Sequence, residues 1–138
     1  MTKDVAIPQE GGTFRTTMKE YLCGYFGDLN SATATTSSVY LRIPFRCILL
    51  KAFITTYGAP TGTDIVVTLA LNGTTLTNNS TITCTASDAA AGNSYTAAGA
   101  LDQQVRVFAN YGDTFSFVSN HAGTGACPAT ATLEVLAV

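Results

Sequence analysis

The residues whose side chains could carry out covalent chemistry are few and far apart. The single histidine, His121, precedes Cys127 in the segment Ser-Asn-His-Ala-Gly-Thr-Gly-Ala-Cys-Pro. A nucleophilic thiol needs a base beside it and a group that orients the base. No carboxylate lies close to this pair in the sequence. We therefore favour a surface-loop histidine, and a small hydrolase ranks last among the functions considered.

The acidic residues form no evident pair or cluster. Glycoside hydrolysis needs two facing carboxylates, and calcium binding needs several clustered oxygen ligands. The candidates, Asp64, Asp88, Asp102 and Asp113, stand mostly at expected strand entries or turns. Aspartate at such positions commonly bonds to its own backbone. The sequence therefore predicts no enzyme, no bound metal and no cofactor.

The four cysteines also indicate structure rather than catalysis. Cys23, Cys47, Cys84 and Cys127 are widely spaced and show no CxxC pattern. The N-terminus has no apolar stretch typical of a secretory signal, so we expect synthesis in a cytoplasm, where thiols stay reduced. Cys84 alternates in phase with Ile82, which predicts that it packs in the core as a small hydrophobic residue.

The composition indicates an all-β protein and excludes two classes of partner. The 138 residues include 23 threonines, only 12% are charged, and the net charge is −2. Threonine is β-branched and favours strands over helices. Nucleic-acid binding needs a basic surface, and a membrane span needs about 20 apolar residues in a row. We expect neither a nucleic-acid partner nor a membrane partner.

From residue 37 onward, apolar and polar residues alternate with a period of two, which is typical of the strands that would position any site. Apolar positions repeat in this way in several short segments, including 39–43, 48–54, 65–71, 82–84, 105–107 and 131–135. Asn72-Gly73 is typical of a type I′ hairpin turn. Residues 13–26 fit a helix face or a strand, and their aromatic content favours a strand. The pattern predicts an antiparallel β-sandwich over 14–138, preceded by an extended arm over 1–13.

Three groups of residues are candidates for contact with partners. In the arm, Val5, Ile7 and Pro8 fit an extended strand that adds to a partner surface. Residues 47–55 are apolar on both faces, so Leu49 and Phe53 are predicted to face a neighbouring subunit. The tyrosines placed in loops by the pattern are Tyr57, Tyr95 and Tyr111.

One long segment resembles a known family. Leu41-Arg-Ile-Pro-Phe-Arg-Cys-Ile-Leu-Leu-Lys-Ala-Phe-Ile, a Gly/Thr loop and then Asp64-Ile-Val-Val-Thr-Leu-Ala-Leu-Asn-Gly resemble small jelly-roll structural proteins of tailed bacteriophages. The later turn Tyr111-Gly-Asp113 before Phe115 fits the same pattern. The resemblance spans about residues 38–138.

This resemblance implies a non-enzymatic virion protein made in the host cytoplasm. The expected function is capsid decoration (cement) as a symmetric homo-oligomer, most often a trimer, bound to the major capsid protein. The alternative is a tail or fibre tip module that binds a receptor or glycan through aromatic loop residues.

Overall fold

The computed structural model describes residues 8–9, 12–13, 19–58, 61–86, 94–96 and 107–138. Within these ranges the chain is nearly all β, and its one helix, α1 (Ala34–Ser37), has four residues. The all-β prediction is confirmed. The period-two alternation has its physical cause here, because successive side chains of a strand point to opposite faces of the sheet.

The first sheet is antiparallel and has the order β10-β5-β12-β3, with β9 also paired to β5. Its strands are β3 (Lys19–Phe26), β5 (Cys47–Thr56), β9 (Ser94–Thr96), β10 (Phe108–Ala109) and β12 (Ala129–Ala137). The strand expected within residues 13–26 therefore starts at Lys19. Its buried face includes Phe26, and Tyr21 and Tyr25 lie on the exposed face.

The second sheet is also antiparallel and has the order β4-β11-β6-β7, with β8 also paired to β6. Its strands are β4 (Ser38–Arg42), β6 (Ile65–Leu71), β7 (Thr74–Thr75), β8 (Thr81–Cys84) and β11 (Thr114–Ser119). The β6–β7 hairpin turns at Asn72 and Gly73, both with positive φ (51° and 81°). The predicted type I′ turn is confirmed.

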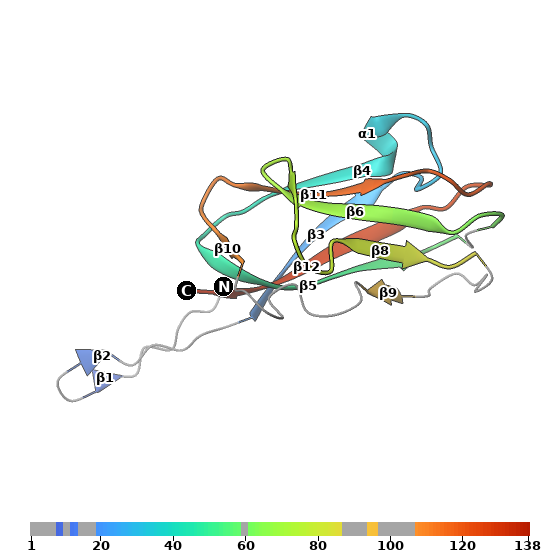
Figure 1. Ribbon diagram of the computed structural model, residues 1–138. Helices are drawn as coiled ribbons and strands as arrows, with labels where there is room; N and C mark the ends of the chain where they lie inside the picture. The colour runs from blue at the N-terminus through green and yellow to red at the C-terminus, as the bar shows by residue number, and fades with distance from the viewer. Residues whose placement is uncertain (1–7, 10–11, 14–18, 59–60, 87–93, 97–106) are drawn as a thin grey trace.

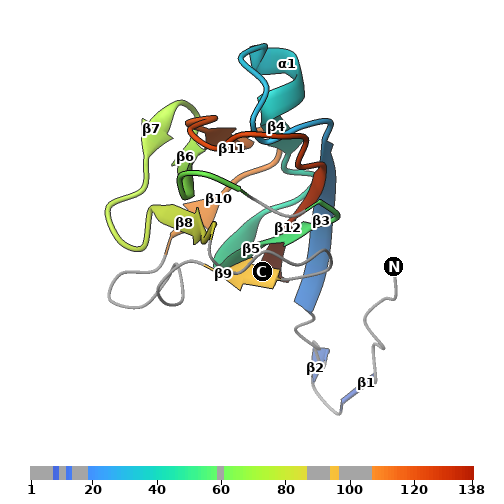
Figure 2. The same cartoon turned by 90° about the vertical axis from the view of Figure 1, so that its right-hand side faces the viewer.

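The strand pairing is nested in a way that defines a jelly roll. The outermost strands β3 and β12 pair, as do β4 with β11, β5 with β9 and β10, and β6 with β8. A long hairpin folded over on itself gives this order, and its two halves become the two layers of a sandwich. Figures 1 and 2 show the two layers from directions 90° apart.

The core lies between the two sheets. Phe26 from the first sheet meets Phe117 from the second at a ring-centroid distance of 6.5 Å, and Phe115 lies 5.2 Å from Phe117. Both pairs are edge-to-face, the arrangement that places a positive ring edge on a negative ring face. Cys84 is fully buried in this core, as predicted.

The structure corrects the prediction for β5. A register shift between Glu134 and Val135 of β12 pairs these residues with Lys51 and Leu49, so Leu50 is an extra residue on β5. A bulge of this kind reverses the alternation beyond it. Leu49 is consequently fully buried in the core together with Ala52 and Ile54, rather than facing outward with Phe53.

The N-terminal residues that the structure describes pair with each other. β1 (Pro8–Gln9) and β2 (Gly12–Thr13) form a two-stranded antiparallel sheet separate from the two sheets of the sandwich. Pro8 lies in this pair, and Val5 and Ile7 lie outside the described residues. The proposed anchoring role of these three residues stays a prediction.

Hydrogen bonds between loops close one end of the sandwich. Asn30 Nδ2 donates to the carbonyl oxygens of Gly125 (2.8 Å) and Thr124 (3.2 Å), and Thr61 Oγ1 donates to Thr124 O at 2.5 Å. A Cβ added at Gly123 would stand 2.8 Å from Asn30 Oδ1, a buried oxygen without a hydrogen-bond partner among the described residues.

Candidate assembly surface

The outward side of the β5–β12–β3 sheet, which we call the outer face, carries an unusual set of side chains. Every second side chain of each strand points outward to this face, because the side chains between them point into the core. The registers align Tyr21, Cys23 and Tyr25 of β3 with Glu134, Thr132 and Thr130 of β12, and these with Lys51, Phe53 and Thr55 of β5. Six of these nine residues are therefore aromatic or threonine.

Two tyrosines flank a threonine at one end of the outer face. Tyr25 is 64% exposed and stands directly opposite Thr130. The Tyr57 hydroxyl lies 2.7 Å from Thr130 Oγ1. This hydrogen bond holds the Tyr57 side chain beside the sheet, although the ring stays exposed. The result is an ordered aromatic and hydroxyl surface, of the kind that packs against protein or sugar.

Charged residues cross the middle of the outer face. Lys19 Nζ lies 3.2 Å from Glu134 Oε2, and Glu134 is buried although it points away from the core. Because the lysine end of this pair is exposed to water, the pair contributes little to stability. Glu134 stands between Tyr21 of β3 and Lys51 of β5, so a row of polar and charged side chains crosses the sheet at this level.

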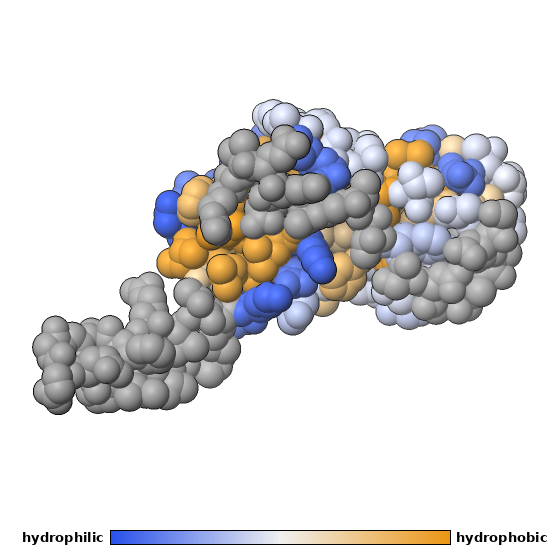
Figure 3. Space-filling view, turned by 60° about the horizontal axis from the view of Figure 1, so that its bottom comes forward, coloured by the Kyte–Doolittle hydropathy of each residue, from blue (hydrophilic) through white to orange (hydrophobic). Residues whose placement is uncertain are grey.

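The opposite end of the outer face is apolar. Phe108 and Val138 are 43% and 39% exposed, and Leu50 and Leu136 are half-buried. The Arg46 guanidinium carbon lies 4.7 Å from the centroid of the Phe108 ring, which is the geometry of a cation–π contact. Figure 3 shows apolar residues gathered on this part of the surface, beside a band of hydrophilic residues.

The tyrosines predicted as loop contacts differ in accessibility. Tyr57 is exposed beside the outer face, and Tyr111 is exposed in the turn before β11, with the Arg42 guanidinium carbon 5.8 Å from its ring centroid. Tyr95 belongs to strand β9, pairs with Ile54 and is buried in the core cluster. That position corrects the prediction of a loop contact. The residues 87–93 and 97–106 around β9 lie outside the described residues.

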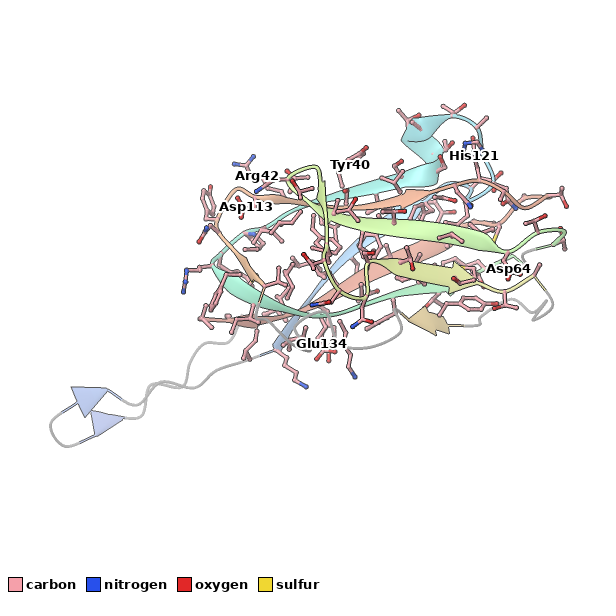
Figure 4. The ribbon with its side chains drawn as sticks, viewed as in Figure 1. Tyr40, Arg42, Asp64, Asp113, His121 and Glu134 are labelled. Atoms are coloured by element: carbon pink, nitrogen blue, oxygen red, sulfur yellow. The ribbon has the colours of Figure 1, made fainter. Side chains whose placement is uncertain are left out.

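The two residues considered as a catalytic pair, His121 and Cys127, do not form a catalytic site. His121 is exposed in its loop, and Cys127 is fully buried with its Sγ 3.5 Å from Gly58 O. Burial, followed by the negative charge of Asp28, raises the pKa of the Cys127 thiol to about 11. A nucleophilic cysteine requires the opposite shift. Figure 4 shows Asp113 at the opposite end of the sandwich from His121 and Asp64.

One of the two described aspartates makes the local backbone bond predicted for it. Asp64 Oδ1 accepts from Ala86 N, 22 residues away, at 2.9 Å, whereas Asp113 Oδ2 accepts from Asn110 N within its own turn at 2.8 Å. The latter bond, together with one from the Asn72 side chain, lowers the pKa of Asp113. Asp88 and Asp102 lie outside the described residues. In the described part of the chain, no three His, Cys, Asp or Glu side chains gather as a metal site.

The four cysteines are free thiols, and they differ in accessibility. Cys23 is exposed on the outer face, with its Sγ 3.8 Å from Thr132 Oγ1. Burial raises the pKa of Cys47 to about 11 and that of Cys84 to about 12. Cys23 is therefore the thiol that a reagent in solution reaches first.

Sequence reasoning did not select Tyr21 and Tyr25 as contact residues. The signal was present in the alternation Tyr-Leu-Cys-Gly-Tyr, which places both tyrosines and Cys23 on one side of a strand. Aromatic residues on strands are usually core residues, so that signal competes with a packing role. Only the position of Phe26 in the core and the register with β12 establish which side faces water.

Comparisons with known proteins do not place the chain in a family. No helix among the described residues is long and apolar enough to cross a membrane. No protein-family model matches the chain, and no curated protein matches it either.

Proposed function

We propose that the chain is a non-enzymatic structural protein that assembles with copies of itself and with a larger protein particle through the outer face. The observation that carries this proposal is the concentration of exposed aromatic and apolar side chains on the outward side of one sheet. The outward side of the other sheet also carries the exposed Tyr40 and Val118, but most of its outward positions are threonine or serine, among them Thr68, Thr81 and Ser116. Exposed apolar patches of this kind mark interaction surfaces.

The particle in this proposal is the head of a tailed bacteriophage, and the protein is a decoration (cement) protein of its capsid. The sequence resemblance and the jelly-roll topology support this choice, since jelly rolls are frequent in viral capsid proteins. Fold alone is an analogy and does not determine function. A decoration protein acts in many copies, so modest affinity for each capsid subunit still gives firm attachment.

Residues of the outer face can be tested against a matched residue of the other sheet. Val138 and Val118 are both 39% exposed, but Val118 lies on β11 of the second sheet. A buried charge opposes association strongly. We expect Val138→Asp or Phe108→Asp to weaken binding to the particle and Val118→Asp to leave that binding unchanged. Self-association is followed separately by light scattering. A monomeric wild type at high micromolar concentration would contradict self-assembly.

Attachment to the particle needs a separate measurement. Virions of a phage that encodes the chain should carry it on the head in electron micrographs, and virions without the gene should lack that density. Adding back purified protein should restore the density, and Phe108→Asp should restore it poorly. Density at the tail tip instead of the head would contradict capsid decoration.

A second candidate function is supported by the group Tyr25, Thr130 and Tyr57. Exposed rings beside an ordered hydroxyl pair are suited to stack on a sugar, and lectin domains also use jelly rolls. In that case a glycan array would show binding that Tyr25→Ala and Tyr57→Ala abolish. Tyr40→Ala is the control, since Tyr40 is equally exposed (65%) but lies on the second sheet.

A further inference from the structure

Strand β3 forms an open edge of the β5–β12–β3 sheet. It pairs with β12 on one side, and no described strand pairs with it on the other. Figure 2 shows it along one side of the sandwich, next to β12. An open edge presents unpaired N–H and C=O groups that another strand can bind.

The backbone groups that point to this open edge can be identified. Pro128 O accepts from Tyr57 N at 2.7 Å and Val138 N donates to Arg46 O at 3.1 Å, so even-numbered residues of β12 bond towards β5. Odd-numbered residues bond towards β3, where Leu133 opposes Leu22 and Ala131 opposes Gly24. Since bonding direction alternates along a strand, the N–H and C=O groups of Tyr21, Cys23 and Tyr25 point to the open edge.

The open edge of β3 lacks the features that usually protect edges. Its register with β12 runs without a bulge, it contains no proline, and its charged residues, Lys19 and Glu20, stand only at its start. The other edge strands are shorter, with five residues in β4 and four in β8. The far side of β5 is covered in part by β9 and β10. A long edge without a bulge or a proline is a site of strand pairing.

The sequence of β3 is complementary to itself about Cys23. An antiparallel copy centred there sets Tyr21 opposite Tyr25 of the second copy, and Leu22 opposite Gly24. Aromatic cross-strand pairs are favourable.

We propose that two copies of the chain join β3 to β3 in antiparallel register about a two-fold axis at Cys23, so that their outer faces form one continuous surface. A two-fold contact requires a self-complementary patch, which this strand provides. The inference rests on the proposed self-assembly and specifies its geometry. It gives an even number of subunits rather than a lone trimer. Because one strand pair buries less than a standard interface, we expect a weak dimer with a Kd of roughly 1–100 μM.

A cross-link at Cys23 tests the axis directly. Facing residues of an antiparallel pair that exchange hydrogen bonds have Cα atoms about 5.5 Å apart, within the range that a disulfide spans. Diamide would take one hydrogen from each of two Cys23 thiols, which join as a disulfide. We expect a covalent dimer on a non-reducing gel with the wild type and none with Cys23→Ser, because the other three thiols are buried.

Random collision is controlled by moving the exposed thiol. Tyr40→Cys in the Cys23→Ser background places an exposed thiol on β4 of the second sheet. We expect cross-linking at Cys23 to be at least tenfold faster than at this position. Equal rates would overturn the proposed pairing.

Light scattering at high micromolar concentration separates the two proposals. Cys23→Ser should remain a dimer, and Cys23→Lys, which sets two like charges opposite each other on the axis, should become a monomer at the same concentration. A trimer for Cys23→Ser would overturn the β3 pairing and leave self-assembly standing. A monomer for both the wild type and Cys23→Ser would overturn both.

Discussion

Strands β3 and β4 lie on the same side of the sandwich, one at the edge of each sheet. They differ in how available their edges are for pairing with another strand. β4 has five residues, is followed by Pro44, and its end is fixed by bonds from Ile43 N to Asp113 O (2.8 Å) and from Gly112 N to Ile43 O (2.9 Å). β3 has eight residues, and the chain just after it is held by bonds from Asp28 N to Thr36 O (3.1 Å) and from Leu29 N to Cys127 O (2.9 Å). Both strands bury one face in the core. The length of the strand, rather than its hydrophobicity, therefore distinguishes the edge available for pairing.

Proline substitutions at neighbouring positions of β3 would test this assignment most strongly. Leu22 N–H bonds to β12, so Leu22→Pro should remove a ladder bond and lower the free energy of unfolding by about 3 kcal/mol or more. Cys23 N–H points to the open edge, so Cys23→Pro should cost about 1 kcal/mol or less. Urea unfolding followed by circular dichroism measures both values.

Two controls separate backbone effects from side-chain effects. Leu22→Ala gives the cost of losing the half-buried leucine, and Cys23→Ser gives that of losing the thiol. After this correction, a larger loss for Cys23→Pro than for Leu22→Pro would reverse the assignment of the open edge. Cys23→Pro should also abolish self-association, because it removes a donor from the pairing edge.

The closest approach between the two edge strands is at Gly24. A Cβ at this position would stand 2.3 Å from Val39 Cγ1 and 3.1 Å from Leu41 Cδ2. Gly24→Ala should therefore force β3 and β4 apart and lower the free energy of unfolding by about 2 kcal/mol. Removing the obstructing methyl groups with Val39→Ala should recover part of this loss in the double variant, beyond additivity.

The outcome that would contradict this close packing is simple additivity. If Gly24→Ala and Val39→Ala each lower stability and their effects sum in the double variant, the two positions do not interact. Gly27→Ala serves as a control, because a Cβ there would meet Thr36 only at an ordinary contact distance of 3.5 Å. We expect it to cost less than Gly24→Ala.

Much of this arrangement could be predicted from the sequence, because alternation specifies which residues share a face. It predicted the strands that became β4, β6, β8 and β12, the Asn72–Gly73 turn and the buried position of Cys84. It failed at Leu49, because a bulge is a single extra residue that leaves no trace in an apolar segment. Tyr95 was misplaced because its three-residue strand stands in a segment without apolar period.

The outer face was harder to predict from the sequence than the fold. An exposed Tyr21 and a buried Phe26 are both aromatic residues of one strand, and only pairing with β12 distinguishes their sides. Strand order was also hidden, because the partners β3 and β12 are at opposite ends of the chain. The strand order determines which edge of the sheet is open, and no local sequence pattern indicates that order.

The turn that closes the end of β4 is hydrogen-bonded to the carboxylate of Asp113. Its carboxylate accepts hydrogen bonds from Asn110 N and from the Asn72 side chain, which lower its pKa in the folded protein. A group with a lowered pKa stabilises the fold above its unfolded pKa, which is about 3.9 for aspartate, and loses that contribution as pH falls further.

The smallest expected effect is therefore a change in the pH dependence of stability on Asp113→Asn. At pH 7 the wild type should melt at a slightly higher temperature than the variant, because the neutral amide is a weaker acceptor than the carboxylate. As the pH falls from 5 to 2.5, protonation of Asp113 makes the wild type resemble the variant, so the difference in Tm should shrink towards zero. Calorimetry at several pH values measures it. A difference that stays constant or grows in acid would show that the charge of Asp113 does not stabilise the closed end of β4.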